Sequence, residues 1–270
     1  MKTRSCHIMQ KINQLIKYWH RGTVAIQSWL EKQGIYRQLA ERYCKSGWLE
    51  RIGSGAYILS GDKVSWEGAL YALQAEANMQ INVAALTALE LQGSAHFIPM
   101  NQNHPVWLFK NNDQKNIPAW FKQSFTTKHS LKIVNRHLFD GDWRLGLIEQ
   151  NMGEYKILIS SRERAIFEYF DLVPGQQSFE HGVLLMELLQ TLRPVLIQEL
   201  LEKCTSIKVK RLFMNVAEMQ NHEWVKNLDL SKIDFGSGNR VIKKGGKLFK
   251  KYGLLLPVVN SDENEDDNQP

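Results

Sequence analysis

Five polar side chains near residue 40 have the types and spacing of a helix face that contacts nucleic acid. Residues three or four apart lie together on a helix surface, so all five would point to one side. An arginine can donate to both major-groove acceptors of guanine, and a glutamine amide can pair with adenine. The acidic member would repel phosphate unless it pairs with a cation one turn away or accepts from a cytosine amine. The five are Arg37, Gln38, Glu41, Arg42 and Lys45.

Three short helices are predicted to position this face. Apolar residues at helical spacing predict an amphipathic helix over residues 9–19. Thr23 is the expected N-cap of a second helix, because its hydroxyl can accept a free backbone N–H, and it is also expected to be among the residues that contact DNA. Gly34 is expected to end that helix. The third helix covers about residues 36–45 and carries the five polar side chains. A tight turn at Gly34 would hold this third helix rigidly enough to enter a major groove.

A β-hairpin is predicted directly after the third helix. Residues 48–52 and 56–59 are two short β-prone runs around a Gly-Ser-Gly tip. Arg51 at the base and Ser54 at the tip could contact a DNA backbone or minor groove. Three helices followed by a hairpin is the order of a winged helix-turn-helix, which we predict for residues 1–62. Winged helices also serve as protein-docking or purely structural modules, and the sequence alone leaves these alternatives open.

A second basic segment lies near the end of the chain. Residues 236–256 have short strand-like runs with glycine-rich turns. Gly245-Gly246-Lys247 does not fit a nucleotide-binding P-loop, because Val241 stands where glycine is needed and Leu248 where Ser or Thr would bind magnesium. The segment is instead expected to touch DNA phosphates, the alternative being a solvated hairpin rim. Its cations are Arg240, Lys243, Lys244, Lys247, Lys250 and Lys251.

Charge is segregated along the chain. The net charge is +6. Residues 1–60 hold ten Lys/Arg against three acids, and residues 236–260 hold six against none. Residues 261–270 hold five acids and are expected to be a disordered tail. Positive charge at both ends of a nearly neutral body is expected for a polyanion-binding protein.

The rest of the chain predicts a larger second domain of mixed α/β type over residues 64–258, so the fold class is α+β. Residues 61–63 are interpreted as a short hinge. Residues 66–77 and 81–91 are predicted to be helices, 105–160 to hold four strands, and 178–220 to hold three helices. Ser160 or Ser161 is the expected cap of a helix over the residues that follow.

Composition argues against several other classes of protein. Cys6, Cys44 and Cys204 are far apart and odd in number, which favours a reducing, cytoplasmic compartment. The histidines show no metal-binding spacing, no segment reads as a signal peptide, and no apolar run could span a membrane. We therefore expect no metal, no cofactor and no membrane partner.

No catalytic residues are predicted. Asp140, Asp142 and Glu149 lack the Glu-x-Lys spacing of a metal-dependent nuclease. Glu163 and Arg164 have a plain structural explanation at a helix start, where Arg164 can pair with Glu168. An enzymatic second domain that modifies a toxin or a nucleotide, with the winged helix for targeting or docking, remains the alternative.

Four stretches, in order, resemble the AbiEi-type antitoxins. The resemblance implies a two-domain antitoxin of a type IV abortive-infection toxin–antitoxin pair, whose winged helix represses the shared promoter. It implies double-stranded promoter DNA and a nucleotidyltransferase toxin as partners, the toxin being countered without a stable complex. One departure is Ala84-Ala85, where the family usually has a Ser/Thr–His pair. The stretches are residues 42–57, residues 83–93 with Ala95-His96, residues 161–168, and residues 238–247 with Tyr252.

Overall fold

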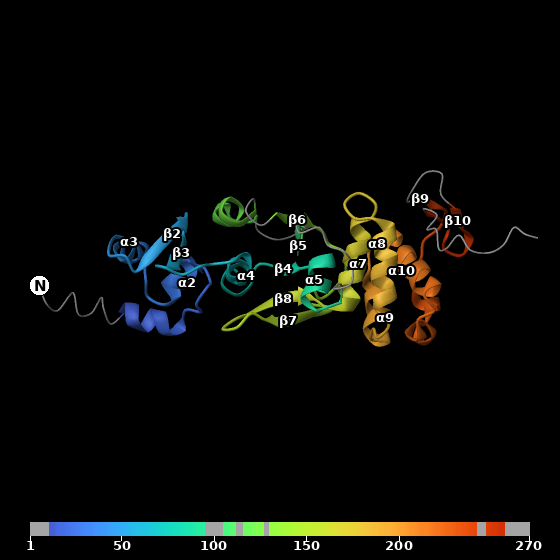
Figure 1. The fold of residues 1–270 in the computed structure, drawn as a ribbon, viewed down its shortest axis with the longest axis horizontal. Helices are drawn as coiled ribbons and strands as arrows, with labels where there is room; N and C mark the ends of the chain where they lie inside the picture. The colour runs from blue at the N-terminus through green and yellow to red at the C-terminus, as the bar shows by residue number, and fades with distance from the viewer. Residues whose placement is uncertain (1–10, 95–104, 112–115, 127–129, 242–246, 257–270) are drawn as a thin grey trace, which may run out of the picture. The chain divides into compact units, whose positions relative to one another are not determined.

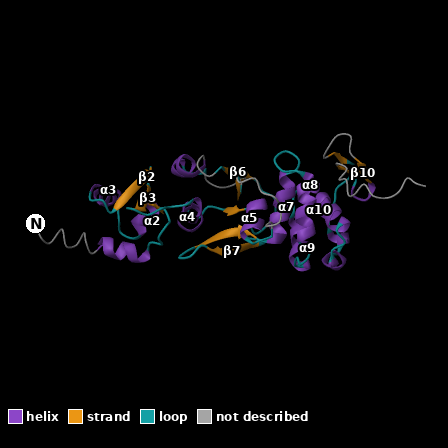
Figure 2. Ribbon diagram, viewed as in Figure 1, coloured by secondary structure: helices purple, strands orange, loops and turns teal. Residues whose placement is uncertain are grey.

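The computed structural model describes residues 11–94, 105–111, 116–126, 130–241 and 247–256 (Figure 1). The chain divides into two compact units. The first comprises residues 1–87, 98–137 and 147–160, and the second comprises residues 88–97, 138–146 and 161–270. Helices and strands are both abundant (Figure 2), which confirms the predicted α+β class. The tail 261–270 lies outside the described residues.

The first unit begins with the predicted three helices and hairpin. Residues 11–18 are helical, and they are followed by α2 (Gln27–Lys32) and α3 (Arg37–Lys45). The hairpin strands β2 (Leu49–Gly53) and β3 (Ala56–Leu59) pair antiparallel. Apolar side chains from all of these elements form one core, which includes Ile12, Leu15, Leu30, Tyr43 and Tyr57.

The prediction that Thr23 caps the second helix is wrong. A two-residue strand β1 (Ala25–Ile26) pairs with β3, so α2 starts only at Gln27 with Ile26 as its N-cap. Thr23 is 1% exposed, and its hydroxyl donates to the carbonyl of His20 at 2.7 Å. The other end of α2 agrees with the prediction, since Gly34 follows it with a φ of +76°.

A five-stranded mixed sheet completes the first unit. Its order is β6-β5-β4-β8-β7; β4 runs parallel to β8, β5 runs parallel to β6, and the other two pairs are antiparallel. Before the sheet, α4 continues into a π-helical turn (Ala72–Glu76), and between β5 and β6 a short helix α6 continues into the π-helical turn η2. The bounds are α4 Trp66–Tyr71, α6 Ala119–Phe121, η2 Lys122–Thr126, β4 Ile81–Val83, β5 Val106–Lys110, β6 Leu131–Asn135, β7 Leu147–Asn151 and β8 Lys156–Ser160.

The single helix predicted over residues 81–91 is two elements. Strand β4 comes first, and helix α5 (Ala85–Leu91) follows it. Residues 81–89 are all buried, and a continuous buried apolar run does not distinguish a strand from a helix by periodicity. The change of direction occurs at Ala85, which has a φ of +48° although it is not glycine.

Residues 61–63, which we expected to form a hinge, are held in place by contacts with the winged helix. The Asp62 carboxylate accepts from Arg21 Nη1 at 2.7 Å and from the backbone N–H of Gly22 at 3.2 Å. Gly68 lies so close to the carbonyl of Gly22 that no Cβ would fit there. The ion pair holds Asp62 against Arg21, and the close backbone packing holds α4 against Gly22, so both ends of the segment are fixed by contacts.

Four α-helices and a small sheet make up most of the described part of the second unit. They are α7 (Arg162–Leu172), α8 (Phe179–Leu188), α9 (Pro194–Lys203) and α10 (Ile207–Met219). The three helices predicted over residues 178–220 are thereby confirmed, and Ser161 is the N-cap of α7. A three-stranded sheet of order β10-β11-β9 follows, from β9 (Arg240–Val241), β10 (Lys247–Phe249) and β11 (Leu254–Leu256). Among the described residues, no helix is long and apolar enough to cross a membrane.

Candidate nucleic-acid interface

The exposed face of α3 carries all five of the polar side chains predicted for it. Arg37, Gln38, Glu41, Arg42 and Lys45 are exposed, whereas the opposite face buries Ala40 and Tyr43. Three cations and one amide therefore stand together on a helix whose other side is fixed in the core. Within the described part of the chain Glu41 forms no ion pair. Arg37, Arg42 and Lys45 are thus not neutralised by it through direct contact.

The hairpin presents its tip to solvent. Ser54 and Arg51 are both exposed, and Arg51 Nε donates to the carbonyl of Gly53 at 3.1 Å. The strand register shifts between Arg51 and Gly53, which is the irregularity of a β-bulge. The bulge bends β2, and the bond from Arg51 holds its side chain beside the tip.

A second segment of the first unit braces this hairpin. A Cβ added to Gly53 would lie 2.5 Å from Trp120 Cβ, so only glycine permits the observed approach. Beside it, the hydroxyl of Ser124 donates to the carbonyl of Ile52 at 3.4 Å. Helix α6 and the π-helical turn that follows it therefore support one side of the wing.

Two exposed aromatic side chains flank α3 and were not among the predicted contacts. Tyr36 is the N-cap of α3 and is 68% exposed. Trp48, which directly precedes β2, is 40% exposed. The alternation of strand side chains could have shown this, because Leu49 is buried in the core and its neighbour must face the other way.

The remaining predicted DNA contacts differ in how exposed they are and in whether they already form an ion pair. Burial removes Thr23 from any surface that DNA could reach, so that contact prediction is wrong. Arg240 and Lys250 are exposed, whereas Lys251 Nζ donates to Glu218 at 2.6 and 2.7 Å. That ion pair reduces the charge which Lys251 could offer to phosphate. Lys243 and Lys244 lie outside the described residues, and of Lys247 only the backbone is described.

The polar residues at the start of α7 hold the second unit together. The Glu163 carboxylate, 5% exposed, accepts from Arg193 Nε and Nη2, both at 2.9 Å, and from its backbone N–H at 3.0 Å. Burial would raise the pKa of Glu163, but these bonds outweigh it and lower the pKa to about 2. The stabilisation is therefore present above the ordinary carboxyl pKa of 4.5 and is lost as the pH falls through about 2. Glu163 fixes the first turn of α9 onto α7.

Another carboxyl group, Glu76, lies where the winged helix meets the π-helical turn after α4. Its Oε2 accepts from the backbone N–H of Ile26 at 2.9 Å. Burial raises the pKa of Glu76 to about 8, although the Ile26 N–H and the charge of Lys32 act in the opposite direction. A carboxyl group of this kind prefers its proton in the folded protein.

The free energy of unfolding should consequently fall as the pH rises from about 4.5 to about 8, because the folded protein keeps the Glu76 proton and the unfolded chain releases it. We expect Glu76→Gln to remove this slope and to raise stability at pH 8 by on the order of 2 kcal/mol, since Gln keeps the acceptor for Ile26 without the charge. Urea denaturation of both proteins at pH 5 and pH 8 measures it. Glu31→Gln, at an exposed position of α2, is the control, and equal slopes in all three proteins would contradict the prediction.

The fold and this site define a winged-helix protein whose third helix shows a basic, exposed face. Two family models match the chain: the N-terminal domain of the AbiEi antitoxin transcriptional regulators over residues 8–100, and the AbiEi antitoxin transcriptional regulators of type IV toxin–antitoxin systems over residues 103–257. The chain belongs to this family of antitoxin transcriptional regulators. The families are regulatory antitoxins and not known enzymes.

Among solved structures, the chain is similar to the crystal structure of the RV2827C protein from Mycobacterium tuberculosis. The sequence identity is 13%, the match covers 90% of this chain and 88% of the other, and the TM-score is 0.57. This likeness shows a shared fold. No curated protein matches the chain.

Proposed function

We propose that this antitoxin represses its own promoter by binding double-stranded DNA through α3 and the wing. The observation that carries the proposal is the exposed face of α3, on which Arg37, Arg42 and Lys45 surround Gln38. A rigid helix with these side chains can place guanidinium and amide groups against base edges in a major groove. The wing would add Arg51 and Ser54 to the backbone or minor groove.

The two exposed aromatic residues extend this interface. Tyr36 and Trp48 stand at the two ends of α3. A tyrosine hydroxyl can donate to a phosphate oxygen, as side chains that position a protein on a duplex commonly do. We propose that these residues fix the register of α3 on DNA and carry no base preference themselves.

The C-terminal sheet is proposed as a second region of phosphate contact. Arg240, Lys250 and Lys251 are exposed cations among its described residues, and the sequence supplies Lys243, Lys244 and Lys247 nearby. Contacts of this kind position a protein and do not read sequence. Lys251 is the weakest member because Glu218 already binds it.

We further propose that residues 1–62 form the DNA-binding domain and residues 64–258 the antitoxin domain. The toxin would be a nucleotidyltransferase encoded with this chain, and it would be countered without a stable complex. The family membership supports the regulator and antitoxin roles. The resemblance of four sequence stretches to the AbiEi-type antitoxins supports a nucleotidyltransferase as the toxin.

Fluorescence anisotropy with the upstream intergenic duplex and a scrambled duplex, at several salt concentrations, tests DNA binding. We expect a preference for the native duplex of about tenfold or more. If about six cations neutralise phosphates, log affinity should fall against log salt with a slope of roughly −5. Equal, weak binding to both duplexes would contradict the regulator, and tight binding that ignores salt would favour a protein-docking winged helix.

A further inference from the structure

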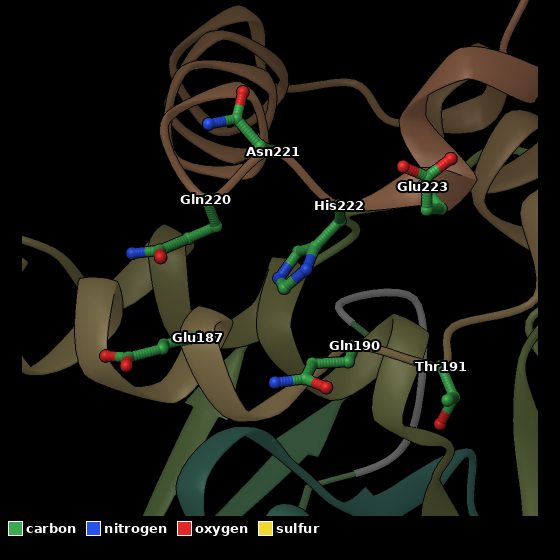
Figure 3. A pocket seen from close by; sticks show the side chains of 7 residues that line it. All are labelled: Glu187, Gln190, Thr191, Gln220, Asn221, His222 and Glu223. Carbon is green, nitrogen blue, oxygen red and sulfur yellow. The ribbon is translucent and has the colours of Figure 1, made fainter.

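A polar cavity lies in the second unit where the C-terminal ends of α8 and α10 come together. Its volume is about 420 Å³. Figure 3 shows Glu187 and Gln190 on one side and Gln220, Asn221 and His222 on the other. Every side chain that lines it is polar. A pocket of this composition suits a small, charged, hydrogen-bonding group better than an apolar one.

The imidazole of His222 gives this cavity a fixed acceptor. The residue is 8% exposed, and its Nε2 lies 2.7 Å from the carbonyl oxygen of Met186. A carbonyl only accepts, so Nε2 must be the donor to Met186. In the tautomer that carries its proton on Nε2, Nδ1 is an acceptor. Among the described residues Nδ1 has no hydrogen-bond partner. His222 therefore brings to the cavity wall an acceptor that no other described side chain engages.

The wall around this histidine is rigid. The His222 ring stacks on Trp224 with ring centroids 5.5 Å apart, and Trp224 Nε1 donates to the carbonyl of Leu189 at 3.2 Å. Asn221, with a φ of +52°, makes the sharp turn after α10 that directs His222 inward. Two rings thus anchor the last carbonyls of α8, so the acceptor is held in place before any ligand arrives.

The electrostatics of the cavity favour positive charge. Two helices, of ten and thirteen residues, end here and direct the negative ends of their dipoles toward the cavity, although His222 and Trp224 already donate to two carbonyls at the end of α8. Glu187 adds an exposed carboxylate. Glu223 adds another, which pairs with Lys226 at 2.7 Å; both side chains are exposed, so the pair is weak and exchangeable.

We propose that this cavity binds an organic cation with several N–H donors, namely a guanidinium or primary ammonium group. Glu187 would provide the opposing charge, His222 Nδ1 would accept one hydrogen bond, and the amide oxygens of Gln190 and Gln220 would accept others. In the described part of the chain no three His, Cys, Asp or Glu side chains form a metal-binding group, which favours an organic cation over a metal ion. The group can belong to a free amine or to an Arg or Lys side chain of a partner protein.

Isothermal titration calorimetry of the full chain with two probes tests the site. The probes are agmatine and the peptide acetyl-Gly-Arg-Gly-amide, each up to about 10 mM. We expect saturable binding of one or both, weakened about tenfold or more by Glu187→Gln. Stronger binding of agmatine assigns the site to a free amine, and stronger binding of the peptide assigns it to a partner side chain.

Glu180→Gln is the matched control, because Glu180 is an exposed carboxylate of the same helix α8 outside the cavity. It should leave the affinity unchanged. Gln190→Ala, at an exposed position of the wall, should also weaken binding without disturbing the fold. Absence of saturable binding for both probes, or equal loss in the Glu187 and Glu180 variants, would overturn the proposal. The test involves no DNA, so its outcome is independent of the repressor function.

Discussion

Replacing Arg42 with alanine is expected to weaken binding of the promoter duplex by about 1–3 kcal/mol, or roughly 5- to 150-fold, and to relax base preference at one position. Arg42 is exposed on the helix face that we place in the major groove. Removal of a bidentate donor leaves a guanine edge without its partner, so the native duplex should lose more affinity than the scrambled one. Anisotropy titrations of both duplexes at one salt concentration measure the difference.

Two further variants show whether Arg42 reads a base or only a phosphate. Arg42→Lys keeps the charge but loses the planar fork of donors. Compared with Arg42→Ala, it should therefore regain affinity for the scrambled duplex while the preference for the native duplex stays low. Arg144→Ala removes an exposed arginine from the second unit, outside the winged helix, and should change neither. An equal loss of affinity for both duplexes in Arg42→Ala would refute base readout and leave a phosphate contact.

Replacing Arg164 with alanine is expected to lower the free energy of unfolding by about 3–5 kcal/mol, the cost of breaking a buried ion pair. Arg164 Nε donates to Glu168 at 2.8 Å, and its Nη1 donates to the carbonyls of Trp143 and Leu145, both at 2.7 Å. Glu168 is fully buried and would lose its guanidinium partner. Urea denaturation followed by circular dichroism measures the change.

The neighbouring Arg162 supplies the control for this prediction. It is exposed and donates to the carbonyl of Gln92 at 3.1 Å, so Arg162→Ala should cost less than about 1 kcal/mol. If Arg164→Ala lowered the free energy of unfolding no more than Arg162→Ala does, the bonds of Arg164 would not stabilise the second unit. At temperatures where the variant stays folded, its affinity for DNA should equal that of the unchanged protein.

The winged helix was the most predictable part of the fold, because its signals are local. The apolar spacing around Ile12 and Leu15, and the glycines that end α2 and α3, act within one or two turns of chain. The face of α3 follows from the same periodicity, which explains why its five polar side chains are all exposed. The Arg164–Glu168 pair was also predictable, since it joins residues one helical turn apart.

The features that sequence reasoning missed depend on distant partners. Thr23 precedes a strand, not a helix, because Ala25 and Ile26 pair with a segment thirty residues away. Strand β4 shows no alternation of buried and exposed residues, because its side chains are buried on both faces of the sheet, and such a run cannot be told from a buried helix by its spacing. The bonds of Glu163 to Arg193 could not be foreseen either, since they cross thirty residues of sequence.

The contact between Gly53 and Trp120 bears on how an operator would be chosen. A wing that is braced along one side has already lost its conformational freedom during folding, so ordering it costs little when DNA arrives. Such a wing does not adjust to the duplex, and the duplex must adjust to the wing. Sequences whose groove width and stiffness suit the fixed spacing of α3 and the hairpin tip would then be preferred even at base pairs that no side chain touches.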